Sequence, residues 1–242
     1  MSKNVDTICV QGGYQPGNGE SRTPPIIQAT TFKYKSSEQM SRLFDLSESG
    51  YFYTRLQNPT NDTIAAKICE MEGGAAAMLT SSGQARTSSH CSTSATTATT
   101  SSHPPRSTAH VQPHQRDHAQ NGHRMHVRKP GLHRRRARSG IPAEHQAVFG
   151  ESISNPALIV LDFEKFANAA HRHGVPLIVD NTFPTPVNCR PFQYGVDIVN
   201  ARHHQIYGRS TAPALGGAIV DSGNFDWIGP CGEIPRTSTT PD

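Results

Sequence analysis

Apolar residues follow a helical period over residues 61–72, which predicts an amphipathic helix early in the chain. Thr60 or Asn61 can cap its first turn, and two consecutive glycines end the pattern. The residues expected to face the core are Ile64, Ile68 and Met71. Residues 1–50 show no such period and contain several glycine and proline turns, so we expect them to be rich in loops.

A second helical pattern covers residues 162–173. The residues expected to face inward there are Phe163, Phe166, Ala167 and Ala170. Apolar runs too short for helices predict strands at residues 75–79, 175–179, 197–199 and 217–220. Because these strands alternate with helical patterns, the sequence favours a parallel α/β sheet.

The apolar pattern stops between residues 86 and 146. This window contains ten Lys and Arg residues, two acidic residues and nine of the thirteen histidines, but only five Val, Ile, Leu or Met residues and no aromatic one. The window carries a formal charge of +8 and the rest of the chain −4, which together give the net +4. Burial of these few apolar groups cannot offset the conformational entropy that the window would lose on folding. We therefore expect the window by itself to be disordered.

Composition argues against several classes of function. No apolar run is long enough to span a membrane, and the first residues lack the apolar core of a signal peptide. The five cysteines form no CxxC pair, so neither a zinc site nor a disulfide framework is indicated, and a cytoplasmic location is expected. The basic window could contact nucleic acid, but it lacks stacking aromatic residues, and its irregularly spaced histidines suit adventitious metal capture better than a built site.

Asp180 is the strongest candidate for chemistry. It directly follows an apolar strand, and ligands of open α/β sheets bind beyond that end of the strands. A carboxylate at such a buried position needs a partner. A helix-capping role is the alternative interpretation.

Two further segments suit a phosphate. Ser82, Gly83 and Gln84 follow a predicted strand and could present a hydroxyl and free N–H groups, although an ordinary loop is the alternative. Tyr53 and Arg55 are two residues apart, so on an extended segment they share a face, although a surface salt bridge is the alternative.

In this order and at these distances, the three segments resemble the pyridoxal-phosphate enzymes of cysteine and methionine metabolism, most of all their O-acetylhomoserine sulfhydrylase branch. The resemblance covers roughly residues 4–85, 147–199 and 214–227. It implies the α/β fold of the type I PLP-dependent transferase large domain, a mainly parallel sheet flanked by helices. Here that domain is expected to be incomplete, with a disordered or misread middle.

The resemblance also implies a cofactor, pyridoxal 5'-phosphate, and roles for its ligands. In the family, a Tyr-x-Arg pair binds the phosphate in the neighbouring subunit, and a Ser-Gly-x turn binds it within the same subunit. The asparagine of an Asn-Pro pair contacts the ring hydroxyl, and the aspartate of Val-Asp-Asn-Thr binds the ring nitrogen. The matching cofactor-binding residues here are Tyr53 and Arg55, Ser82, Gly83 and Gln84, Asn155, and Asp180.

The family's central lysine is missing. It belongs to a Ser-x-Thr-Lys motif near Gln205 and Ile206, but this chain has no lysine after Lys165, so no catalytic residue is assigned. Codons permitted for residues 202–209, read one base later, spell Ala-Thr-Thr-Lys-Tyr-Met-Asp-Gly. Shifted codons for most of residues 86–146 also spell family-like sequence. We therefore expect that this protein sequence is translated from a gene, or from a sequencing read of a gene, that contains small insertions or deletions.

Together with these patterns, the resemblance implies four regions. Residues 1–60 are an arm that contributes to a neighbouring subunit, and residues 61–85 and 147–227 form the cofactor-binding domain. Residues 86–146 are the basic histidine-rich window, and residues 228–242 are a truncated tail. The implied reaction is γ-replacement on O-acetylhomoserine by sulfide or a thiol, giving homocysteine or methionine, in a homotetramer or homodimer without nucleic-acid or membrane partners. Without the lysine, the chain is expected to be inactive. The alternatives are a non-catalytic fragment or pseudogene product, or a member similar to cystathionine γ-synthase or methionine γ-lyase.

Overall fold

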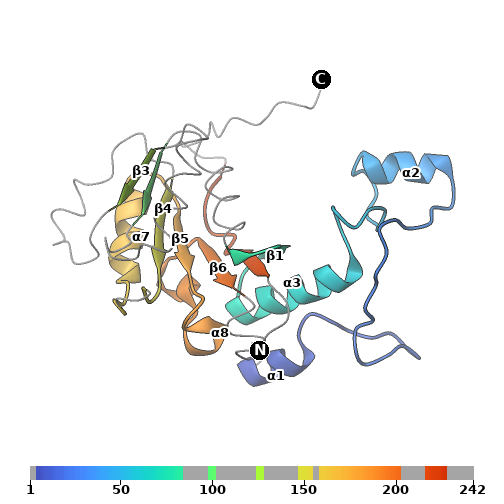
Figure 1. Ribbon diagram of the computed structural model, residues 1–242, viewed down its shortest axis with the longest axis horizontal. Helices are drawn as coiled ribbons and strands as arrows, with labels where there is room; N and C mark the ends of the chain where they lie inside the picture. Colours follow the sequence, from blue (N-terminus) through green and yellow to red (C-terminus); the bar gives the residue numbers. More distant parts are fainter. Residues whose placement is uncertain are drawn as a thin grey trace. The chain divides into compact units, whose positions relative to one another are not determined.

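A computed structural model describes residues 4–83, 98–101, 124–127, 147–154, 158–202 and 216–227 (Figure 1). The chain divides into two compact units, Met1–Met71 and Glu72–Asp242. The region boundaries that the sequence indicates at residues 60 and 85 remain predictions.

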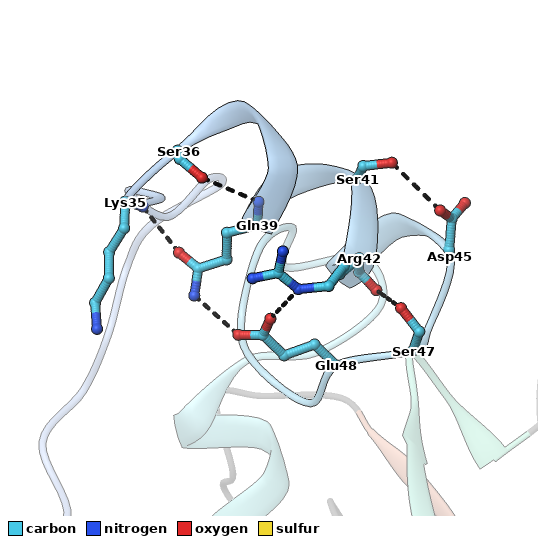
Figure 2. Close-up of polar contacts among 8 residues, drawn as sticks. All are labelled: Lys35, Ser36, Gln39, Ser41, Arg42, Asp45, Ser47 and Glu48. Carbon is cyan, nitrogen blue, oxygen red and sulfur yellow. Dashed lines mark hydrogen bonds and ion pairs between the residues drawn. The ribbon is translucent and has the colours of Figure 1, made fainter.

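The first unit contains two short helices within the residues that the sequence pattern indicates as loops. They are α1 (Val5–Gln11) and α2 (Ser37–Phe44). The Ser36 hydroxyl caps α2 by accepting a hydrogen bond from the Gln39 N–H at 3.3 Å, and the Gln39 side chain accepts one from the Lys35 N–H at 2.8 Å (Figure 2). Gln39 and Arg42 both donate to Glu48, at 3.0 and 2.8 Å. The Ser-x-x-Gln spacing is a capping signature, which apolar periodicity does not reveal.

The third helix, α3 (Pro59–Glu72), matches the helix predicted at 61–72 but begins earlier. Asn58 caps it, in place of Thr60 or Asn61, because its side-chain oxygen accepts a hydrogen bond from the Thr60 N–H at 2.9 Å. Proline suits the first helical position, where no intrahelical donor is needed. Ile68 and Met71 are buried as predicted, whereas Ile64 is 43% exposed, so that part of the prediction is wrong.

The second unit is built on a sheet with strand order β1-β7-β6-β5-β4-β2-β3. The strands are β1 (Ala76–Thr80), β2 (Ala98–Ser101), β3 (Arg124–Val127), β4 (Ala147–Glu151), β5 (Leu177–Asp180), β6 (Ile198–Arg202) and β7 (Gly217–Asp221). Only β7 runs antiparallel to its neighbours β1 and β6, and the other pairs are parallel. The mainly parallel α/β sheet that the sequence predicts is confirmed.

Each face of the sheet has its own apolar cluster. Helix α7 (Phe163–Arg172) packs beside β4 and β5 (Figure 1), where Ala167 and Ala170 contact Leu177, Val179 and other buried residues. The opposite face carries a second cluster, whose members are Ala147, Phe149, Ile178, Ile198 and Ile219, with Trp227 packed against them. Alternate residues of a strand point to opposite faces, which explains why neighbouring residues of β5 and β6 divide between the two clusters.

Two short helices follow β5, α8 (Thr185–Asn188) and the 3₁₀ helix η1 (Pro191–Tyr194). Of the basic window 86–146, only β2 and β3 belong to the described residues, so the expected disorder of the remainder lies outside them, as does the tail 228–242. Within the described residues, no helix is both long and apolar enough to cross a membrane.

Candidate functional site

Asp180 is the last residue of β5 and is only 7% exposed. One of its carboxylate oxygens accepts hydrogen bonds from the Thr182 N–H, at 3.0 Å, and from the Thr182 hydroxyl. In the sheet register Asp180 lies between Glu151 of β4 and Asn200 of β6. The carboxylate is therefore fixed at the carboxyl end of the parallel strands, where the sequence predicts it.

An apolar floor lies below Asp180 on the same face of the sheet. Ile178 and Ile198 are two residues before Asp180 and Asn200 along their strands, so they point to the same face as these two polar residues. Both isoleucines belong to the cluster that Trp227 covers in part. Ile178 and Ile198 are 0% and 2% exposed, so a planar group could rest on them only by displacing what now covers them, with its polar atoms turned toward the carboxylate.

The turn after β1 lies at the same edge of the sheet. Strand β1 runs parallel to β5, because two antiparallel pairings, through β7, separate it from β6. Ser82 and Gly83 thus follow the carboxyl end of β1, and the Thr80 hydroxyl donates to the Ser82 carbonyl at 3.0 Å. Three strand spacings, about 14 Å, separate β1 from β5.

Gly217 holds this turn close to the sheet. A Cβ atom at this position would lie 2.7 Å from the Thr80 hydroxyl oxygen and 2.8 Å from the Ser82 carbonyl oxygen. Only a glycine lets the start of β7 approach the turn so closely. The backbone around Ser82 is therefore fixed by packing as well as by hydrogen bonding.

A buried polar network supports the segment that follows Asp180. The Asn181 side chain is completely buried; its oxygen accepts from the Ser152 hydroxyl at 2.8 Å and its nitrogen donates to the Cys189 carbonyl at 2.9 Å. Asn181 also approaches the Glu72 carboxyl at 3.5 Å. No local sequence pattern points to these residues, because they lie far apart along the chain.

Glu72 is the titratable member of this network. Burial raises its pKa to about 8, although the Asn181 hydrogen bond and the positive charge of Arg190 act in the opposite direction. Burial, together with the nearby Glu72 carboxyl, also raises the pKa of the Cys189 thiol. At neutral pH the Glu72 carboxyl is therefore mostly protonated.

A second buried carboxylate, that of Asp197, stabilises the fold. Asp197 precedes β6, at the opposite edge of the sheet from Asp180, and accepts hydrogen bonds from the Leu177 N–H at 2.7 Å and from the His171 ring at 2.8 Å. Burial raises the pKa of Asp197, whereas the Leu177 and His171 contacts lower it. Asp197 thereby joins α7 to β5 and β6.

Tyr53 and Arg55 belong to the first unit, where the guanidinium lies 5.0 Å from the centre of the phenol ring. They are close together, as their spacing predicts, but Thr54 to Leu56 form a turn and not an extended segment. Gln84, Asn155 and the expected position of the lysine near Gln205 lie outside the described residues.

Comparison with known proteins identifies the family. The sequence profile described as "Cys/Met metabolism PLP-dependent enzyme" matches residues 6–236. The chain belongs to this family. It is 35% identical over 240 residues to homocysteine/cysteine synthase of Saccharomyces cerevisiae, which covers 94% of this chain and 52% of that protein. It is 31% identical over 236 residues to O-acetyl-L-homoserine sulfhydrylase of Leptospira meyeri, which covers 92% of this chain and 50% of that protein. The chain thus spans about half the length of the curated relatives it matches.

Solved structures give the same assignment of fold. A putative O-acetylhomoserine (thiol)-lyase of Campylobacter jejuni, which carries a pyridoxyl-lysine monophosphate, matches with a TM-score of 0.82 and 27% identity over 92% of this chain and 54% of that one. A methionine γ-lyase of Micromonospora echinospora matches with a TM-score of 0.74 and 28% identity over 90% of this chain and 56% of that one. The type I PLP-dependent transferase fold and the family resemblance expected from the sequence are both confirmed.

Proposed function

We propose that this chain is the cofactor-binding part of an enzyme similar to O-acetylhomoserine sulfhydrylase. Such an enzyme uses pyridoxal 5'-phosphate to replace the γ-substituent of O-acetylhomoserine by sulfide or a thiol, giving homocysteine or methionine. One observation carries the proposal: a buried carboxylate, Asp180, lies above an apolar floor at the sheet edge that also holds the Ser82 turn. The names and activities of the relatives support the choice of substrate.

The described residues fit this cofactor. Asp180 would pair with the protonated ring nitrogen, since a carboxylate favours the charged form of a neighbouring base. The apolar floor around Ile178 and Ile198 would take the face of the ring, and the N–H groups of the Ser82 turn would take the phosphate. When bound, the cofactor supplies an electron-poor ring that stabilises negative charge on the substrate.

The chain lacks a residue that could hold the cofactor covalently at the expected place, because its last lysine is Lys165. We therefore propose weak, non-covalent binding and no turnover. Reduction with borohydride should leave no cofactor attached to the protein. A cofactor-bearing peptide after reduction would contradict this proposal.

The other assignments remain proposals. Tyr53 and Arg55 would hold the phosphate in the neighbouring subunit of a homodimer or homotetramer, and Gln84 and Asn155 would complete the site within one subunit. A cytoplasmic location is proposed from the cysteine pattern alone. A non-catalytic product of a damaged gene is the second candidate function, and the missing lysine favours it.

The proposal is tested by titrating the full chain with pyridoxal 5'-phosphate while the fluorescence of Trp227 is recorded. This residue is the only tryptophan and packs on the apolar floor, so a bound ring should quench it. Asp180→Asn should weaken binding by about tenfold or more, because a charge-assisted hydrogen bond is lost. Asp45→Asn removes an exposed carboxylate from the first unit and is the control. Equal affinity of the wild type and Asp180→Asn would refute the assigned role.

A further inference from the structure

Two asparagines at the carboxyl edge of the sheet, Asn181 and Asn200, are both 0% exposed but have very different surroundings. The amide of Asn181 is fully engaged by Ser152 and Cys189. In contrast, neither the side-chain oxygen nor the side-chain nitrogen of Asn200 has a hydrogen-bond partner within the part of the chain that the structure describes. The backbone of Asn200 is nevertheless well fixed, because its carbonyl accepts from the Asn181 N–H at 2.7 Å.

An unpaired amide is an unfavourable choice for this position. Buried polar groups almost always have partners, and a group without one loses its hydration without compensation. The neighbouring positions of β6 are apolar, with Ile198 and Val199 before Asn200 and Ala201 after it, all buried. A leucine has the same branching and the same number of side-chain heavy atoms, and it would leave no polar group unpaired here. Folding of the chain alone therefore gives no reason for an asparagine.

The position of Asn200 indicates what its amide could contact. It pairs in register with Asp180 across parallel strands, so the two side chains point to the same face of the sheet. Strand β6 lies between β5, which carries Asp180, and β7 and β1, which lead to the Ser82 turn. Asn200 thus lies between the two groups that are proposed to hold the ends of the cofactor.

We infer that Asn200 is a further ligand-binding residue, whose amide hydrogen-bonds a polar atom of the heteroaromatic phosphate held between Asp180 and the Ser82 turn. This inference rests on the proposed function, because it assigns Asn200 to the same ligand. It also explains the unpaired amide: the donor and acceptor are satisfied only when the ligand is bound. Stability of the free protein is lower as a consequence, and affinity for the ligand is higher.

The test is Asn200→Leu in the full chain, with two measurements. The unfolding temperature of the free protein should be about 2–6 °C higher for Asn200→Leu than for Asn181→Leu, because both changes add the same bulk and only the second breaks hydrogen bonds. Affinity for pyridoxal 5'-phosphate, measured by equilibrium dialysis, should fall at least fivefold, or about 1 kcal/mol. Asn181→Leu is the matched control: it replaces an equally buried asparagine whose amide has partners, so its unfolding temperature should fall.

The outcomes separate this inference from the proposed function. If the wild type binds the cofactor and Asp180→Asn weakens binding, but Asn200→Leu binds as tightly as the wild type, the inference alone is overturned. An unfolding temperature that is no higher for Asn200→Leu than for Asn181→Leu also overturns it, since the Asn200 amide would then serve the fold. If the wild type shows no saturable binding, the proposed function fails and the inference fails with it.

Discussion

The buried carboxyl of Glu72 predicts a strong dependence of stability on pH. Its pKa is about 8 in the folded protein and 4.5 in an unperturbed chain, and the side chain is 1% exposed. Below pH 4.5 the carboxyl is protonated in both the folded and the unfolded protein, so it does not lower the free energy of unfolding. Between the two pKa values unfolding releases a proton, so stability falls by about 1.4 kcal/mol per pH unit, and above pH 8 the full cost of about 5 kcal/mol applies.

The charged and titratable neighbours of Glu72 do not remove this dependence. Arg190 favours the ionised carboxyl, and its effect is already included in the raised pKa of Glu72. The Cys189 thiol has its own pKa raised, so it stays neutral over the acidic and neutral range. Between pH 5 and pH 7 the expected loss of stability due to Glu72 is therefore about 3 kcal/mol.

Glu72→Gln isolates this contribution, because the amide keeps the shape of the side chain but cannot ionise. Urea unfolding followed by Trp227 fluorescence should be measured for both proteins at several pH values between 5 and 7. The wild type should lose about 3 kcal/mol more than Glu72→Gln, since the other titrating groups are common to both. Glu164→Gln, which removes an exposed carboxylate from α7, controls for the loss of one charge. Parallel stability curves for the wild type and Glu72→Gln would refute the reasoning.

Three further predictions concern other parts of the chain. His171→Ala should lower the free energy of unfolding at pH 6 by about 1 kcal/mol, because the buried Asp197 carboxylate loses a hydrogen bond of 2.8 Å from the half-exposed His171 ring; no measurable loss in urea unfolding would contradict this. Gly217→Ala should cost about 1–3 kcal/mol and also weaken binding of pyridoxal 5'-phosphate, since the new Cβ would displace the Ser82 backbone; unchanged affinity in dialysis would argue against a phosphate at that turn. Sequencing the source DNA should reveal small insertions or deletions upstream of the codon for Gln205, and an intact reading frame would remove the explanation for the missing lysine.

Local sequence patterns determined the main elements of the second unit. The apolar runs at 75–79, 175–179, 197–199 and 217–220 correspond to β1, β5, β6 and β7. Strands β5 and β7 are buried along most of their length, as continuous apolar sequence predicts, whereas the burial predicted for the first strand is wrong, because Met78 of β1 is 56% exposed. The helix predicted at 162–173 corresponds to α7, whose N-cap Asp162 accepts from the Lys165 N–H at 3.1 Å. Asp180 could be selected for the same reason, since an acid that directly ends an apolar strand is a local signal.

The sequence pattern did not predict features that depend on packing between distant segments. Ile64 has the correct helical spacing but lies on an exposed part of α3, because spacing alone does not state how wide the covered face is. The contact between Asn181 and Glu72 joins residues 109 positions apart, which no local pattern encodes. The unpaired state of Asn200 likewise depends on its neighbours in space, since a single polar residue within a strand gives no sign of its partners.

The sequence by itself therefore determined the family and the order of the strands along the chain, and it selected Asp180, which is proposed to face the ring nitrogen. Only the tertiary structure decided that β1 and β5 present their carboxyl ends at one edge, because that follows from two antiparallel pairings through β7. It also decided which buried polar groups near Asp180 are satisfied and which are not. The physical reason is that strand propensity and apolar periodicity act over a few residues, whereas hydrogen-bond satisfaction depends on segments that folding brings together.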